Sequence, residues 1–249
     1  MSLKHLMCAD VLWLVGGIYG SPDQPARFRV RMTVTKRARI LLADDHSLVA
    51  AGICKLLETE FDLIGTVGDG RALVGAAKSN PPDVILLDIS MPILNGLEAA
   101  RQLRTVLPNV KLIFVTVHSD NAYVMEAFRA GGSGYVLKRS AASELPAAIH
   151  EVLNGNLYVT PLIDNSAVEG FRNGHDTRTP VLSGRQREVL QLVAEGYSAK
   201  EIAKLLSISS KTVEFHKGLI MKKLDLHSTA ELTQYALQHG IAGNLSSAL

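Results

Sequence analysis

Residues 84–96 read VILLDISMPILNG, and this stretch decides the fold. Four consecutive apolar residues are typical of a short buried strand, and Asp88 ends the run. After the loop, Asn95-Gly96 leads into a segment whose apolar residues recur at helical spacing. A strand, a loop and a helix in this order predict one unit of a parallel sheet with helices packed on it.

The same alternation begins at Arg39 and continues to residue 158. We expect strands at 40–43, 63–67, 84–87, 112–115 and 134–137, with helices near 47–59, 70–79, 96–106, 120–130 and 142–153. Right-handed crossovers arrange such units as a doubly wound, flavodoxin-like α/β fold with five parallel strands. Functional residues of that fold gather at the carboxyl ends of the strands.

A change in composition marks where this domain ends. Residues 159–180 break the alternation with Pro, Gly and Asn, so we predict a linker there. Residues 181–241 hold four short helix-like segments without a strand pattern, which predicts a small all-α domain. The α/β domain is then 39–158, and 1–38 is an N-terminal extension that we expect to be disordered or to come from an upstream start.

The composition is ordinary for a soluble globular protein, and the two cysteines make a reducing cytoplasm the natural compartment. Of 249 residues, 47% are hydrophobic and 20% are charged, which argues against a disordered chain. Cys8 and Cys54 are far apart in sequence, so neither a disulfide framework nor a zinc site is indicated. The apolar stretch 11–19 is shorter than the roughly 20 residues of a membrane-spanning helix, and we expect no membrane association.

Three carboxylates meet at one edge of the expected sheet. The first strand ends in Asp44-Asp45 and the third ends in Asp88. Carboxylates this close repel one another unless a cation joins them, and oxygen ligands at this density suit Mg²⁺. The fourth and fifth strands add Thr116 and Lys138 at the same edge, where a hydroxyl and an ammonium suit the oxygens of a phosphoryl group.

Taken together, these strand-end residues resemble the receiver domain of two-component response regulators. The resemblance implies that Asp88 accepts phosphate from a sensor histidine kinase, with Lys138 and Thr116 contacting the phosphoryl group. It assigns the Mg²⁺ ligands to Asp44, Asp45, Asp88 and the backbone carbonyl of Ser90. Tyr135 matches the aromatic switch of the family, and a strand tyrosine without a switching role is the alternative.

The C-terminal domain shows signals for helix starts. It reads LSGRQREVLQLVAEG over 182–196, SAKEIA over 198–203 and SSKTVEFHK over 209–217. Ser183, Ser198 and Ser209 or Ser210 are candidate N-caps. Residues 182–240 resemble the LuxR/FixJ-type helix-turn-helix, and this domain order is that of the NarL/FixJ regulators. The resemblance makes the helix near 209–223 the one that enters the DNA major groove.

Contacts with double-stranded DNA are expected from the outer face of this helix. Residues 209–223 carry four lysines against one glutamate, although a solvated basic face has the same charge. We assign Lys211, Thr212 and Lys222 to phosphates. We expect Glu214 to accept a hydrogen bond from cytosine and Phe215 to contact a thymine methyl, unless Phe215 packs inside the domain. Gly218 costs about 1 kcal/mol in a helix, so we expect it to allow close approach to DNA.

The last helix, 229–238, either closes the small core or contributes to a homodimer on DNA. The resemblance implies a switch in which the receiver and linker cover the recognition helix or its dimer surface until Asp88 is phosphorylated. The protein then has no turnover activity beyond phosphotransfer to itself and its own dephosphorylation. Two alternatives are a degenerate, phosphate-independent receiver and an aspartyl-phosphate phosphatase, which generally needs an aspartate where Ser90 stands.

Overall fold

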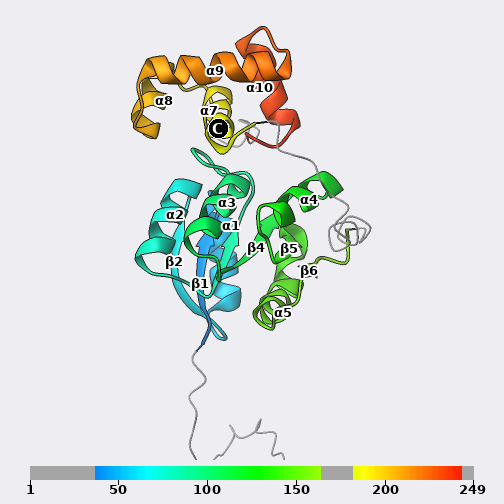
Figure 1. Ribbon diagram of the computed structural model, residues 1–249. Coiled ribbons are helices and arrows are strands. Elements are labelled where there is room, and N and C mark those ends of the chain that lie inside the picture. The colour runs from blue at the N-terminus through cyan, green and yellow to red at the C-terminus, as the bar shows by residue number, and fades with distance from the viewer. Residues whose placement is uncertain (1–36, 164–181, 243–249) are drawn as a thin grey trace, which may run out of the picture. The chain divides into compact units, whose positions relative to one another are not determined.

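The computed structural model describes residues 37–163 and 182–242 (Figure 1). The predicted N-terminal extension lies outside these ranges except for residues 37–38, and the predicted linker lies outside them except for residues 159–163. The α/β domain contains β1 Arg39–Ala43, α1 Ser47–Leu57, β2 Asp62–Val67, α2 Gly70–Ser79, β3 Val84–Leu87, α3 Gly96–Val106, β4 Lys111–Thr116, α4 Asn121–Arg129, β5 Gly134–Leu137, α5 Ala141–Leu153 and β6 Tyr158–Val159.

The sheet is parallel throughout, in the order β2-β1-β3-β4-β5-β6. It therefore has six strands rather than the predicted five. The added strand, β6, pairs Tyr158 with Gly134 and Val159 with Tyr135. Two residues are too few to produce a detectable strand pattern, so the sequence does not indicate this strand. Ile163 is also buried in this domain, so the domain extends beyond residue 158.

Helices cover both faces of the sheet because successive strand residues point to opposite sides. Leu41 and Ala43 pack in one cluster with side chains of α2, α3 and α4. Ile40 and Leu42 pack in the other cluster with side chains of α1 and α5. The strands are parallel, so they all end at the same edge of the sheet, where the acidic residues emerge.

The C-terminal domain consists of α7 Gly184–Ala194, α8 Ala199–Leu206, α9 Ser210–Leu224 and α10 Thr229–Gln238 around one core. Ser183 and Ser198 each form a capping box with the residue three positions on, and Ser209, rather than Ser210, caps α9. Gly196 has a φ of +89°, as the turn after α7 requires. Within the described residues, no helix is long and apolar enough to cross a membrane.

Candidate functional site

The carboxyl edge of the sheet holds a buried acidic pair. The side chains of Asp44 and Asp88 are 1% and 2% exposed, whereas that of Asp45 is 29% exposed. Backbone hydrogen bonds fix the pair in place, since Asp44 N donates to Val67 O and Asp88 N donates to the carbonyl of Ala43. Two buried carboxylates side by side require a cation or hydrogen-bond donors.

Lys138 supplies that positive charge. Its Nζ lies 2.8 Å from one oxygen of Asp44 and 2.8 Å from one oxygen of Asp88. Burial alone lowers the pKa of Lys138, but the Asp88 and Asp44 carboxylates outweigh burial and raise it. The ammonium is therefore charged and directed at Asp88 from the end of β5.

The acidic residues fit a divalent metal ion. One ligand atom from each of Asp44, Asp45, His46 and Asp88 lies within 4.8 Å of all the others. Carboxylate oxygens at such distances match the oxygen-rich ligand set that Mg²⁺ prefers. A hollow of about 390 Å³ beside Asp44 and Asp45 gives solvent access between α1 and the end of β2.

Thr116 and Tyr135 both contact the backbone of His118, two residues beyond the end of β4. Thr116 is fully buried at the end of β4. The Tyr135 hydroxyl donates a 2.9 Å hydrogen bond to the backbone oxygen of His118, and the whole tyrosine is buried. The His118 ring stacks on Tyr123 with 4.0 Å between ring centroids. Burial lowers the pKa of His118 and raises that of Tyr135.

The loop after Asp88 is held close to the strand by a glycine. A Cβ on Gly96 would lie 2.0 Å from the backbone oxygen of Asp88, which no side chain tolerates. Gly96 N also donates to Ile89 O at 2.9 Å. The N-terminus of α3 is thereby packed directly against Asp88, the residue that follows β3.

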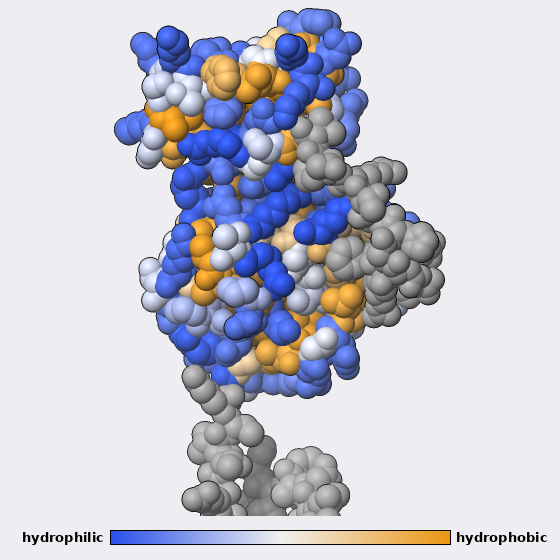
Figure 2. Space-filling model, viewed as in Figure 1, coloured by the Kyte–Doolittle hydropathy of each residue, from blue (hydrophilic) through white to orange (hydrophobic). Residues whose placement is uncertain are grey.

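The expected DNA-contacting residues lie on the outer side of α9. Lys211, Glu214, Phe215, Gly218 and Lys222 are exposed, and Thr212 is half-buried. Phe215 is 62% exposed, so it does not pack inside the domain. A Cβ on Gly218 would meet nothing within 4 Å, so internal packing does not require this glycine. Figure 2 shows hydrophobic and hydrophilic residues intermixed over the viewed face of this domain.

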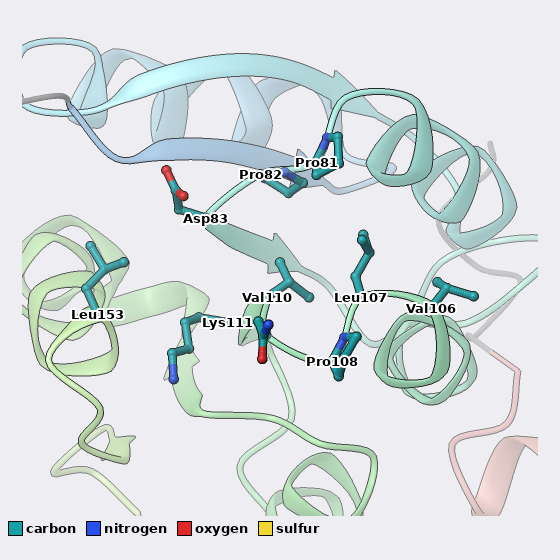
Figure 3. Close-up of a pocket in the computed structure, with 10 residues that line it drawn as sticks. Pro81, Pro82, Asp83, Val106, Leu107, Pro108, Val110, Lys111 and Leu153 are labelled. Carbon is teal, nitrogen blue, oxygen red and sulfur yellow. The ribbon is translucent and has the colours of Figure 1, made fainter.

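A second hollow, of about 350 Å³, lies at the opposite edge of the sheet (Figure 3). Its lining comes largely from the segments that precede β3 and β4, including Pro82, Asp83 and Val110. The Asp83 carboxylate accepts a hydrogen bond from the backbone N–H of Arg39, which gives it a structural role. The converging charged groups are at the other edge, which makes that edge the candidate functional site.

Known proteins share both domains of this chain. Residues 40–150 match the response regulator receiver domain, and residues 180–236 match the bacterial regulatory proteins of the luxR family. The oxygen regulatory protein NreC of Staphylococcus carnosus is 37% identical over 210 residues, which cover 80% of this chain and 97% of NreC. The chain is a response regulator of the NarL/FixJ family.

Solved structures of other response regulators resemble this one along most of its length. RcsB of Salmonella enterica serovar Typhimurium, bound to the promoter P1flhDC in the presence of phosphomimetic BeF3-, is 28% identical. The match covers 82% of this regulator and 100% of that chain, with a TM-score of 0.55. A structure of two RcsB dimers on two parallel DNAs has the same identity and covers 82% and 99%, with a TM-score of 0.51. The regulator accordingly joins a receiver to a DNA-binding domain that regulates transcription.

In this regulator, the loop that follows Asp88 is hydrogen-bonded to α7. The Gln191 side chain accepts from Asn95 N at 2.8 Å and donates to Met91 O at 3.0 Å. Arg187 pairs with Glu98 at 2.7 Å. Gln191 is 1% exposed and Glu98 is 5% exposed, so these polar contacts are shielded from water.

Two histidines of the regulator's site were not among the predicted site residues. His46 follows the Asp pair directly, and its Nδ1 lies 2.8 Å from Asp45. His118 Nε2 lies 2.8 Å from the Ser90 hydroxyl, two residues beyond Asp88. Both histidines share one signal in the sequence: each lies within two residues of a predicted site residue at the end of a strand, His46 after Asp45 and His118 after Thr116. It is weak because loop histidines are common and their ring directions depend on packing.

Proposed function

We propose that this response regulator accepts a phosphoryl group on Asp88 from a sensor histidine kinase, and that phosphorylation changes DNA binding by α9. The observation that carries the proposal is the position of the Lys138 ammonium, 2.8 Å from both Asp88 and Asp44. A buried carboxylate beside a buried cation is poised for a reaction in which negative charge accumulates. A regulator of transcription that binds DNA has its place of action in the cytoplasm.

In the proposed transfer, an Asp88 oxygen attacks the phosphorus of the kinase's phosphohistidine. The P–N bond breaks, its electron pair stays on the imidazole, and an O–P bond forms on Asp88. Lys138 neutralises charge on the phosphoryl oxygens, while Thr116 offers a hydroxyl to one of them. Mg²⁺, which Asp44, Asp45, Asp88 and the carbonyl of Ser90 are proposed to hold, supplies charge neutralisation when bound.

Phosphorylation is proposed to reach the DNA-binding domain through the loop that follows Asp88. This loop is hydrogen-bonded to Gln191 of α7, so a shift that frees Met91 O and Asn95 N changes how α7 is held. We do not propose a switch in which the receiver covers the recognition helix, because the outer residues of α9 are exposed. Tyr135 and Thr116 are proposed to move with the phosphoryl group.

A homodimer on DNA is part of the proposal. Leu232 and Ala236 of α10 are buried in the domain core with α7, so they do not form the dimer surface. Ala230, Gln234 and Gln238 lie four residues apart on α10 and are exposed. We propose that this stripe contributes the contact between two DNA-bound copies.

Phosphorylation with acetyl phosphate and Mg²⁺ tests the proposal. We expect one phosphoryl group on the intact chain by mass spectrometry, tighter binding to selected genomic fragments, and a larger dimer fraction by analytical ultracentrifugation. Asp88→Asn is expected to abolish all three responses, while Asp62→Asn, a change at an exposed residue, preserves them. If acetyl phosphate leaves the DNA affinity of the unmodified protein and of Asp88→Asn unchanged, the receiver is degenerate. Sustained hydrolysis of p-nitrophenyl phosphate would support a phosphatase.

A further inference from the structure

His46 brings a nitrogen donor into a site otherwise made of oxygens. Its Nδ1 lies 2.8 Å from an oxygen of Asp45 and 3.3 Å from an oxygen of Asp44. It belongs to the group of four side chains whose ligand atoms all lie within 4.8 Å of one another. Ligands about 2.0–2.3 Å from a common ion lie no more than roughly 4.6 Å apart, so small shifts let all four surround one ion.

The backbone fixes where this imidazole starts. His46 is the residue before α1, its N–H donates to an Asp44 carboxylate oxygen at 2.8 Å, and its carbonyl accepts from Ala50 N at 3.0 Å. The side chain is 45% exposed and carries no helix-capping hydrogen bond. The ring is therefore held at the rim of the acidic site without a structural role in starting the helix.

Lys138 already neutralises the inner part of the site. Its ammonium bridges Asp44 and Asp88, while Asp45 contacts His46. His46 consequently lies in the solvent-exposed half of the cluster, next to Asp45, where an ion would enter. A ligand in that place affects which ion the site selects.

Ligand chemistry distinguishes the candidate ions. Mg²⁺ is hard, keeps its waters and binds through oxygen, whereas imidazole nitrogen suits transition ions such as Zn²⁺, Cu²⁺, Fe²⁺ and Ni²⁺. We propose that His46 is a direct metal ligand and that its imidazole shifts the preference of the receiver site from Mg²⁺ toward divalent transition ions, with Mn²⁺ as the spectroscopic probe. This inference rests on the metal site of the proposed function and deepens it.

Electron spin-echo spectroscopy of the full chain loaded with Mn²⁺ tests the proposal, because it detects nitrogen bonded to the ion independently of phosphorylation. We expect a ¹⁴N coupling in the unmodified protein, and its loss in His46→Ala. His150→Ala, a matched change of an exposed histidine on α5, should keep the coupling. In competition titrations, His46→Ala should reduce the preference for Mn²⁺ over Mg²⁺ on the order of tenfold.

The outcomes separate the two proposals. Mn²⁺ that binds the unmodified protein without ¹⁴N coupling would overturn the role of His46 and leave the carboxylate site intact. Coupling that persists in His46→Ala would assign the nitrogen to another group and also overturn it. If neither Mn²⁺ nor Mg²⁺ binds the unmodified protein, the metal site of the proposed function is wrong as well.

Discussion

The acidic site of the receiver and the outer face of α9 both consist mainly of polar side chains, but the protein holds them in opposite ways. Asp44 and Asp88 are buried and share Lys138, so each charge there depends on its neighbours. Lys211, Glu214 and Phe215 project from a helix whose own core residues lie on the other side. A change in the first region should therefore alter folding and function together, and a change in the second should alter function alone.

Of the substitutions we propose, removal of the Lys138 ammonium is expected to lower the free energy of unfolding most. Lys138→Met leaves two buried carboxylates without their shared cation, which we expect to lower the free energy of unfolding by about 3 kcal/mol. A divalent ion replaces part of the lost charge, so added Mg²⁺ should recover some of that stability. Urea denaturation with and without Mg²⁺ measures both effects.

Lys111→Met is the control, because Lys111 lies at the start of β4, away from the acidic site, and is only half-buried. It should change the unfolding free energy by roughly 0.5 kcal/mol or less. If Lys138→Met were as stable as this control, the buried charges would not depend on one another as the contrast requires.

Truncation of Phe215 is expected to separate function from folding. Phe215→Ala removes a side chain that is 62% exposed, so stability should change by no more than roughly 0.5 kcal/mol. If the ring contacts a thymine methyl, DNA affinity should fall by about 1–3 kcal/mol, roughly fivefold to 150-fold. Fluorescence anisotropy on a DNA selected by the unmodified protein measures the loss.

Uracil in place of thymine sharpens the same test, because it removes the methyl group from the DNA instead of the ring from the protein. Substitution at the contacted base should weaken the unmodified protein and leave Phe215→Ala unaffected. Equal weakening of both proteins would show that Phe215 does not read that methyl.

The two regions differ in how far their residues can be predicted from the sequence, for physical reasons. The strand ends that carry Asp44, Asp88 and Lys138 follow from apolar runs, because a parallel sheet brings its carboxyl ends to one edge. The sequence also predicted the exposed face of α9 from its helical spacing, but left open whether Phe215 packs inside, since an apolar side chain is compatible with both. His46, β6 and the contacts of Gln191 with the receiver were missed, because ring direction, two-residue pairing and contacts between residues that are 96 and 100 positions apart have no local pattern.

Loss of the Tyr135 hydroxyl should have a smaller effect inside the buried region. Tyr135→Phe removes a 2.9 Å hydrogen bond to the His118 carbonyl but keeps the ring, so we expect about 1 kcal/mol of lost stability. The response of DNA binding to acetyl phosphate should survive, because a ring that moves with Thr116 needs no hydroxyl to fill its pocket. Urea denaturation and DNA titration test the two statements, and a lost response with unchanged stability would contradict both.

Neutralisation of Lys211 should give the smallest and least sequence-dependent change. Lys211 is exposed at the start of α9, and one phosphate contact fewer should reduce the slope of log affinity against log salt by about 1. Lys211→Ala should weaken selected and unrelated DNA by the same factor, since a phosphate contact positions the protein without reading sequence. Lys78→Ala, an exposed lysine at the end of α2, should leave the slope unchanged. A loss confined to the selected DNA would make Lys211 a base-reading residue, and the outer face of α9 would then depend on more than Phe215 for its specificity.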